Sequence, residues 1–188
     1  VGLSRLAVIS GDETNFQVPL DRVARIQLQI DGEILQLDDS VVVLHVSPDG
    51  VRTQLKSLPG PDGWTVAWPA GGGDGIVRVG GRVGHFQLPR QATPQSSPTV
   101  VDMDLEPGGM LVLWGKVALF RELLGTTVTI DSLEGEIPEV YRRYRLDLSG
   151  LRLPLPTGSY RLRLPRDSEV IEAQFKISTG VEGEVTLR

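Results

Sequence analysis

The stretch GSYRLRLPRDSEVIEAQFKI, residues 158–177, consists of two runs of alternating apolar and polar residues separated by a turn signal. A period of two is typical of a half-buried β-strand, because successive side chains of a strand point to opposite faces. The segment between the runs, Pro165-Arg166-Asp167-Ser168, supplies turn residues. The stretch therefore predicts a β-hairpin. Its inward face would carry Tyr160, Leu162 and Leu164 from the first run and Ile171, Ala173, Phe175 and Ile177 from the second.

An echo of this hairpin lies at residues 75–88, and it belongs to an internal repeat. The interval from Gly32 to Gly75 equals the interval from Gly115 to Gly158. Two copies of one fold are therefore expected in the chain. The predicted segments are a first domain at residues 1–90, in which residues 1–12 form an extra strand, a linker at 91–98, and a second domain at 99–188.

The composition narrows the classes of function. The net charge is −5 and the estimated pI is near 5.1, so we do not expect the basic surface that nucleic-acid binding requires. No apolar run is long enough to span a bilayer, and we expect no membrane insertion. The sequence contains no cysteine, which removes disulfides and thiolate catalysis. The chain begins at Val1 and ends within a strand pattern, so a signal peptide or an anchor could lie outside it.

Prolines and glycines are spread along the whole chain, where they separate many short strands and leave little room for long helices. We therefore predict an all-β fold. The best helix candidate is residues 117–124, which are followed by Gly125. Besides the two arms of the hairpin, the predicted strands are residues 1–10, 16–18, 24–30, 41–46, 64–68, 76–79, 83–88, 100–105, 110–117, 127–130 and 141–148.

Two segments carry a resemblance to a known family. They are EPGGMLVL at residues 106–113 and LPTGSYRL at residues 155–162. They resemble the second-strand entry and the penultimate strand of bacterial immunoglobulin-like or fibronectin type III-like domains. The resemblance implies two tandem immunoglobulin-like β-sandwich domains, with Tyr160 as a buried tyrosine corner. In the first half Val77 occupies the matching position.

Three tryptophans are candidates for ligand binding. Trp64 and Trp68 would lie on one face of a strand, and an exposed pair of indoles could stack on sugar rings. A sandwich strand also needs bulky inward residues, and we favour this core interpretation for both. Trp114 leaves the same two alternatives open.

Four arginines would form two outward pairs, Arg143 with Arg145 and Arg161 with Arg163. Such pairs could hold sulfate, phosphate or an acidic glycan, because guanidinium groups bind these anions through two parallel hydrogen bonds. Exposed arginines on strands more often keep sheet edges soluble, and we favour that interpretation.

The remaining polar residues indicate neither a metal site nor a catalytic site. Asp102, Asp104 and Glu106 alternate and could gather carboxylates for calcium, but their spacing does not match a known calcium loop, and we predict no metal site. His45 and His85 are accompanied by no triad signature. We therefore expect no enzyme and no cofactor.

The sequence favours a non-catalytic structural, assembly or adhesion module of a larger surface, secreted or virion protein. Its expected partners are other protein domains or subunits, including further copies of itself, and its expected location is extracytoplasmic. The alternative is a carbohydrate-binding module attached to a glycan-active enzyme, which would rest on Trp64 and Trp68. Strand patterns at both ends of the chain are expected to pair with other strands, because folded proteins normally cover an unpaired edge.

Overall fold

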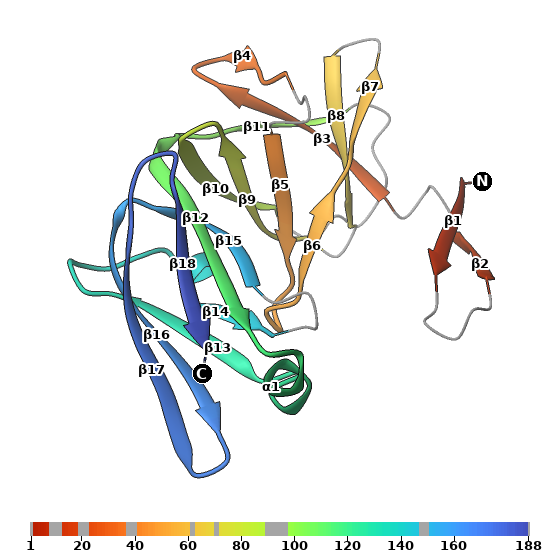
Figure 1. The fold of residues 1–188 in the computed structure, drawn as a ribbon. Coiled ribbons are helices and arrows are strands. Elements are labelled where there is room, and N and C mark those ends of the chain that lie inside the picture. The colour runs from red at the N-terminus through yellow and green to blue at the C-terminus, as the bar shows by residue number, and fades with distance from the viewer. Residues whose placement is uncertain are drawn as a thin grey trace.

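The structure, a computed structural model of the chain, describes most of the backbone and a smaller set of side chains. The described backbone covers residues 2–7, 13–18, 23–36, 41–60, 63–69, 72–88, 98–146 and 151–187. Side chains are described for residues 25–36, 41–57, 64–69, 72–88, 98–146 and 151–187. Strands dominate this part of the chain, with one short α-helix and one 3-10 turn, so the chain is all-β as predicted (Figure 1).

Almost all of the described elements are strands. Up to the middle of the chain they are β1 (Gly2–Ala7), β2 (Glu13–Val18), β3 (Val23–Ile30), β4 (Glu33–Ile34), β5 (Val41–Val46), β6 (Arg52–Leu55), β7 (Ser57–Gly60), β8 (Gly63–Pro69), β9 (Gly73–Val79), β10 (Arg82–Leu88) and β11 (Thr99–Asp102). They continue with β12 (Glu106–Gly115), α1 (Val117–Glu122), β13 (Thr127–Ser132), the 3-10 turn η2 (Glu139–Tyr141), β14 (Arg143–Arg145), β15 (Leu151–Pro156), β16 (Gly158–Arg166), β17 (Glu169–Ile177) and β18 (Glu182–Leu187).

The strands from β3 onward form two units that share one topology. In the first unit, β3 to β11, one sheet has the order β11-β3-β8-β7 and the other contains β6-β5-β9-β10. In the second unit, β12 to β18, the matching groups are β18-β12-β15 and β14-β13-β16-β17. The last strand of each unit lies parallel to the first, β11 beside β3 and β18 beside β12. The repeat expected from the glycine spacing is thus a repeat of strand order.

Strand β10 joins the two units into one sheet. It pairs antiparallel with the start of β12, which gives a seven-stranded central sheet with the order β15-β12-β10-β9-β5-β6 and β18 beside β12. The sheet β11-β3-β8-β7 covers one side of its β5-β9-β10 part. The sheet β14-β13-β16-β17 packs on the opposite side.

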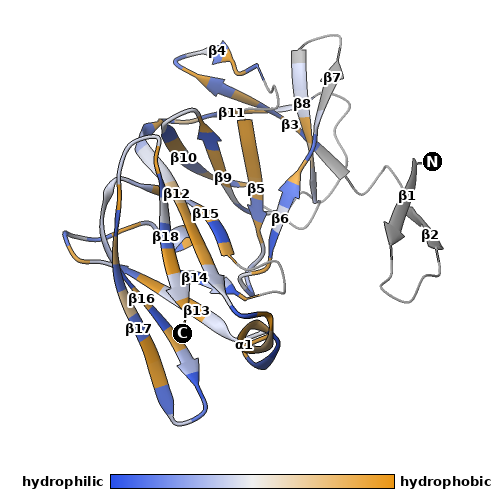
Figure 2. Ribbon diagram, in the orientation of Figure 1, coloured by the Kyte–Doolittle hydropathy of each residue, from blue (hydrophilic) through white to orange (hydrophobic). Residues whose placement is uncertain are grey.

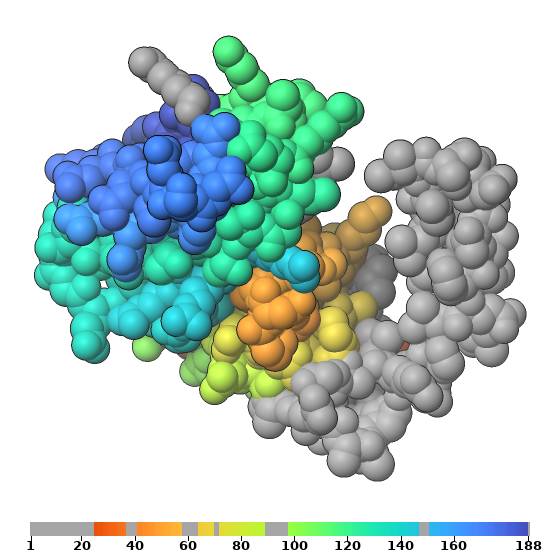
Figure 3. All heavy atoms as spheres, turned by 90° about the horizontal axis from the view of Figure 1, so that it is seen from below, coloured from red at the N-terminus to blue at the C-terminus, as the bar shows by residue number. Residues whose placement is uncertain are grey.

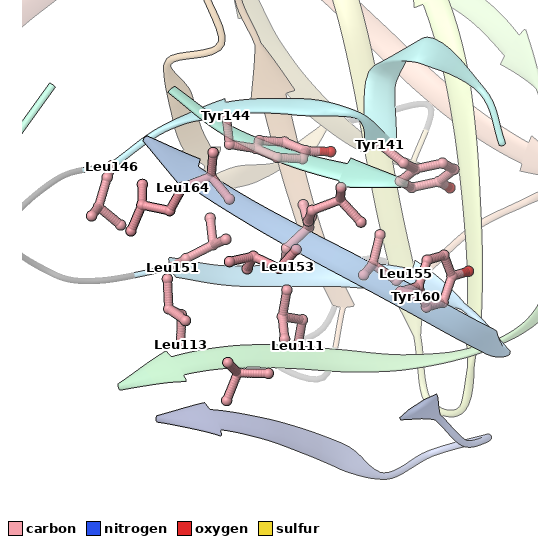
Figure 4. Packing of buried hydrophobic residues seen from close by; sticks show 14 of the residues in the cluster. Leu111, Leu113, Tyr141, Tyr144, Leu146, Leu151, Leu153, Leu155, Tyr160 and Leu164 are labelled. Atoms are coloured by element: carbon pink, nitrogen blue, oxygen red, sulfur yellow. The ribbon is translucent and has the colours of Figure 1, made fainter. Parts of the chain in front are cut away.

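Two hydrophobic clusters lie on either side of the central sheet. The first contains Val43 and Val77 together with residues of β3, β8 and β11. The second contains Leu44, Val46 and Ile76 of the first unit together with most of the core of the second unit (Figure 4). Strand β5 is hydrophobic over most of its length because both of its faces are covered (Figure 2). The continuous apolar run at residues 41–46 therefore forms a central strand, as such a run predicts.

The predicted hairpin at residues 158–177 is confirmed. Its inward residues on β16, Tyr160, Leu162 and Leu164, are buried, and the Tyr160 hydroxyl donates a hydrogen bond to the Pro156 carbonyl at 2.9 Å. Burial raises the pKa of the Tyr160 phenol to about 12, so the hydroxyl keeps its proton and remains a donor. Strand β16 extends through Arg166, so the turn is two residues shorter than predicted.

The other predicted elements agree in part. The hairpin β9–β10 and the helix α1 are confirmed. The strand predicted at residues 141–148 is wrong at its start, where η2 places Tyr141 and Tyr144 on the same buried side, and residues 147–150 lie outside the described residues. At the ends of the chain, β1 pairs with β2 and β18 pairs with β12. Within the described strands, β1 and β2 pair only with each other.

The predicted linker lies almost wholly outside the described residues, since only Pro98 of residues 91–98 is described. The residues that follow it belong by their contacts to the first unit. Val101, Met103 and Leu105 are buried in the first cluster, and β11 pairs with β3. By these contacts, residues 99–105 group with the first unit.

The faces of β16 predict opposite effects of neighbouring substitutions. We expect Leu162→Ala to lower the free energy of unfolding by about 2–5 kcal/mol, because Leu162 is fully buried. Arg163→Ala should cost no more than about 1 kcal/mol, because its ion pair with Asp131 is exposed. Urea denaturation measures both variants, and equal losses would contradict the assignment of the two faces.

Candidate functional site

The structure places the tryptophans of β8 against the first core. Trp68 is 1% exposed, and its ring lies 4.9 Å from the ring of His45 and 5.2 Å from that of Phe86. Trp64 is half-buried and packs on the same cluster. His45 is buried, and its Nε2 lies 3.1 Å from the Gly72 carbonyl oxygen. These two indoles therefore do not form an exposed platform for sugar rings.

Trp114 is the most exposed of the three tryptophans. It is 51% exposed at the end of β12, beside Lys116 and Thr186. These residues line an open and largely apolar hollow of about 580 Å³. Val117, at the start of α1, is also exposed nearby in the sequence. The hollow is the described surface where an aromatic ring is most accessible to a ligand.

The predicted arginines lie on the outer side of the sheet β14-β13-β16-β17. In register, Arg143 and Arg163 both lie opposite Thr129, one on each side of β13, and Arg161 lies opposite Asp131. Three of these arginines each have an acidic partner, and Arg143 lines an open hollow of about 310 Å³ that it shares with the carboxylates of Asp49, Asp74 and Glu139. The pairs are Arg143 with Glu139 at 3.8 Å, Arg145 with Asp49 at 3.8 Å, and Arg163 with Asp131. This surface is a mosaic of both charges, which does not favour anions.

The alternating carboxylates lie between the two units. Asp102, Asp104 and Glu106 are exposed and, with His85, line an open hollow of about 540 Å³. Among the described residues no three acidic or histidine side chains are close enough together to hold a metal ion. The segment serves instead as the passage from β11 into β12.

The contacts between the units are the most extensive feature that the sequence did not reveal. Gly108 of β12 donates its N–H to the Gly81 carbonyl of the first unit at 2.9 Å. Val83, at the start of β10, is completely buried. The junction is therefore built from backbone hydrogen bonds and apolar contact together.

A turn of the first unit rests directly on β14 of the second (Figure 3). The N–H of Arg145 donates to the Gly50 carbonyl at 3.0 Å. Gly50 has a φ of +79°, and a Cβ there would lie 3.1 Å from the Arg143 carbonyl oxygen. Hydrogen bonds from the Ser47 hydroxyl and the backbone lower the pKa of Asp49, and the charge of Arg145 lowers it further. The carboxylate of Asp49 therefore stays charged at neutral pH beside the second unit.

Aromatic rings complete the junction. The Arg52 guanidinium donates to the Arg152 carbonyl at 3.1 Å and lies 5.9 Å from the centre of the Tyr144 ring. His85 of β10 contacts the ring of Tyr141, with the ring centres 5.7 Å apart. Burial raises the pKa of the Tyr144 phenol well above its ordinary value, which keeps it neutral in this setting. The junction thus contains cationic and aromatic contacts as well as the backbone bonds.

Comparisons with known proteins find distant likenesses among solved structures. No protein-family model matches the sequence, and no curated protein matches it. Among solved structures, the chain is similar to the Bacillus anthracis TIE protein, at 14% sequence identity and a TM-score of 0.34, over 89% of this chain and 34% of that one. It is also similar to a candidate adhesin from Bacteroides ovatus, at 10% identity and a TM-score of 0.28, over 88% of this chain and 90% of that one.

The chain thus spans about a third of the length of the TIE protein. At these TM-scores neither likeness carries an argument about what the chain does. In the described part of the chain, no helix is both long and apolar enough to cross a membrane.

The tryptophans should differ sharply in their contribution to stability. Trp68→Ala should cost about 3–5 kcal/mol of unfolding free energy, because the indole is buried among other rings. Trp114→Ala should stay within about 0.5 kcal/mol of the parent chain, since half of its indole is already in water. Thermal or urea denaturation followed by tryptophan emission measures both, and a stable Trp68→Ala variant would contradict the core assignment.

Alanine substitutions at two glycines with the same φ distinguish the cost of backbone strain from the cost of lost contact between the units. Gly32 and Gly50 both have a φ of +79°, but a Cβ at Gly32 would meet nothing within 4 Å. Alanine at either position should therefore cost about 1–2 kcal/mol of backbone strain. Gly50→Ala should lose additional stability because its Cβ presses on β14. Equal melting temperatures for the two variants would mean that the turn at residues 47–50 does not hold the units together.

Proposed function

We propose that the chain is a non-catalytic structural and assembly module composed of two tandem immunoglobulin-like β-sandwich domains. Three features support the immunoglobulin-like or fibronectin type III-like assignment: two packed sheets in each unit, the same strand order in both units, and the hydrogen bond from Tyr160 to the Pro156 carbonyl four residues upstream. The proposed domains are β3 to β11 and β12 to β18, with β1 and β2 preceding them.

The observation that carries the proposal is the shared central sheet. Tandem domains usually move relative to one another unless the surface between them is large and apolar. Here Leu44, Val46 and Ile76 of the first unit are buried in the core of the second. The pair would act as one rigid spacer that keeps its outer faces and edges at fixed positions. Such a part suits a larger surface, secreted or virion protein that works through protein–protein contacts.

The polar residues fit this role because structural contacts account for them. The buried His45 contacts Trp68 and the Gly72 carbonyl, and Arg143, Arg145 and Arg163 pair with carboxylates. We therefore propose that the chain is not an enzyme.

A second candidate function, carbohydrate binding, is favoured by one observation. Trp114 is exposed in an apolar hollow with a lysine and a threonine beside it, which is the kind of platform on which a sugar ring stacks. Trp64 and Trp68 do not support this candidate. Binding on a glycan array that is lost in Trp114→Ala would place it ahead of the structural role.

Rigidity is the measurable property of the proposed spacer. Because the chain has no cysteine, spin labels can be attached at Thr53→Cys and Glu184→Cys, two exposed positions in different units. When the labelled chain is diluted into an excess of unlabelled chain, pulsed dipolar spectroscopy should give one narrow distance distribution in the otherwise unchanged chain. Adding Gly50→Ala should broaden the distribution, whereas adding Gly32→Ala should not. A broad distribution in the parent chain would refute the rigid spacer.

A further inference from the structure

The edge of strand β17 is long and unobstructed over most of its length. β17 has nine residues and pairs with β16, and no described strand pairs with it on the other side. Other edges are blunted in the usual ways: β14 has three residues, and β15 contains Pro154 and Pro156. β17 contains no proline. An edge of this kind normally pairs with another strand.

The first unit shows how the equivalent edge is used. β10 and β17 are the second arms of the two matching hairpins, and β10 pairs with the start of β12 to hold the units together. Val83 is the second residue after its turn in β10, and Val170 is the second residue after the turn in β17. Val83 is completely buried, and the backbone of Gly108 in β12 lies against its side chain, whereas Val170 is 56% exposed. At the corresponding edge of the second unit, the apolar side chain of Val170 is therefore largely exposed to solvent.

The direction of the backbone groups follows from the turn. Arg166 pairs with Glu169 across the two-residue turn, and such a closing pair exchanges both of its backbone hydrogen bonds. Alternate residues of β17 therefore bond to β16, and the residues between them point their N–H and C=O groups outward. The outward residues are Val170, Glu172, Gln174 and Lys176.

One end of this edge is covered. A Cβ placed at Gly183 of β18 would lie 3.1 Å from the carbonyl oxygen of Lys176, so β18 lies against that group. The hydrogen-bonding groups of Glu172 and Gln174 are the central part of the open edge. A strand that binds here has to use these two residues.

We propose that β17 pairs antiparallel with β17 of a second copy of this chain, about a two-fold axis at Ala173. This inference deepens the proposed assembly role and rests on it. The pairing sets Glu172 opposite Gln174 of the other copy, and Gln174 opposite Glu172, so that both residues exchange their outward hydrogen bonds. No like charges face each other directly. The two second-unit sheets become one continuous sheet across the axis.

The side chains of the inner face match under the same axis. Ala173, the smallest side chain of β17, lies opposite itself on the axis. Ile171 lies opposite Phe175, and both are half-buried in their own unit, so the pairing covers the remaining apolar surface. Phe175 is held in place by stacking on Tyr160, with ring centres 5.5 Å apart. The edge is therefore ordered before it binds.

Neighbouring positions of the axis are less suitable. An axis at Glu172 sets two glutamates directly opposite each other, which is destabilising. β18 covers the Lys176 carbonyl, so an axis at Gln174 leaves only the pair of Gln174 with itself, whereas the axis at Ala173 leaves two pairs of Glu172 with Gln174. An axis between two residues would set a residue with outward N–H and C=O groups opposite one whose groups already bond to β16. No hydrogen bonds could then form between the two β17 strands.

Charged substitutions of Gln174 test whether β17 forms the dimer contact and whether Gln174 lies opposite Glu172 of the other copy. The full chain should show a concentration-dependent monomer–dimer equilibrium in sedimentation velocity and light scattering. Gln174→Lys sets a lysine opposite Glu172 and should tighten the dimer by about three- to tenfold, and Gln174→Glu should weaken it by a similar factor. The gain from lysine should shrink as salt is raised.

Matched controls come from Gln54, which is also an exposed glutamine on an edge strand, in the first unit. Gln54→Lys and Gln54→Glu should leave the dimer unchanged, and all four variants should keep the melting temperature of the parent chain. A chain that stays monomeric at about 1 mM, or a dimer that Gln174 does not affect, overturns the pairing. The spin-label distances within one chain test the rigid spacer separately, so a monomer with a narrow distribution would overturn the pairing alone.

Discussion

The burial of both faces of strands β5 and β9 is the constraint on which the rest of the structure depends. Ile76 and Val77 are neighbours in β9 and both are fully buried, on opposite sides of the central sheet. Each such side chain contributes about 1.5–3 kcal/mol when it leaves water. Without the second unit, the face of the central sheet that carries Leu44, Val46 and Ile76 would be exposed to solvent. The first unit therefore depends on the second for half of the burial of its central strands.

Much of the local structure could be predicted because strand periodicity is a local signal. The faces of β16 follow from the alternation of Tyr160, Leu162 and Leu164, and the turns follow from glycine and aspartate. The pairing of β11 with β3 could not be predicted in this way. An alternating pattern shows which side of a strand is buried, but it does not identify the partner strand. Val101 and Leu105 fit either core equally well by sequence alone.

The junction between the units escaped sequence analysis for a similar reason. The arginines of β14 and β16 were correctly expected to point outward, but their acidic partners Asp49, Asp131 and Glu139 come from three other parts of the chain. Gly50 follows an ordinary turn sequence, and its close approach to β14 becomes visible only in the folded chain. One signal was available: residues 41–46 are apolar on both faces, which requires a covering layer on each side of the strand.

The parallel pairing of first and last strands gives each unit a definite response to mechanical load. In the second unit, β12 and β18 lie side by side over six residue pairs and run in the same direction. A force that pulls the beginning of β12 away from the end of β18 acts along the strands, so it loads all the hydrogen bonds of the pair in shear. They must break together rather than one at a time, as they would if the strands were peeled apart. β11 and β3 repeat this arrangement over four pairs in the first unit, so a chain under tension would resist extension at both ends of the spacer.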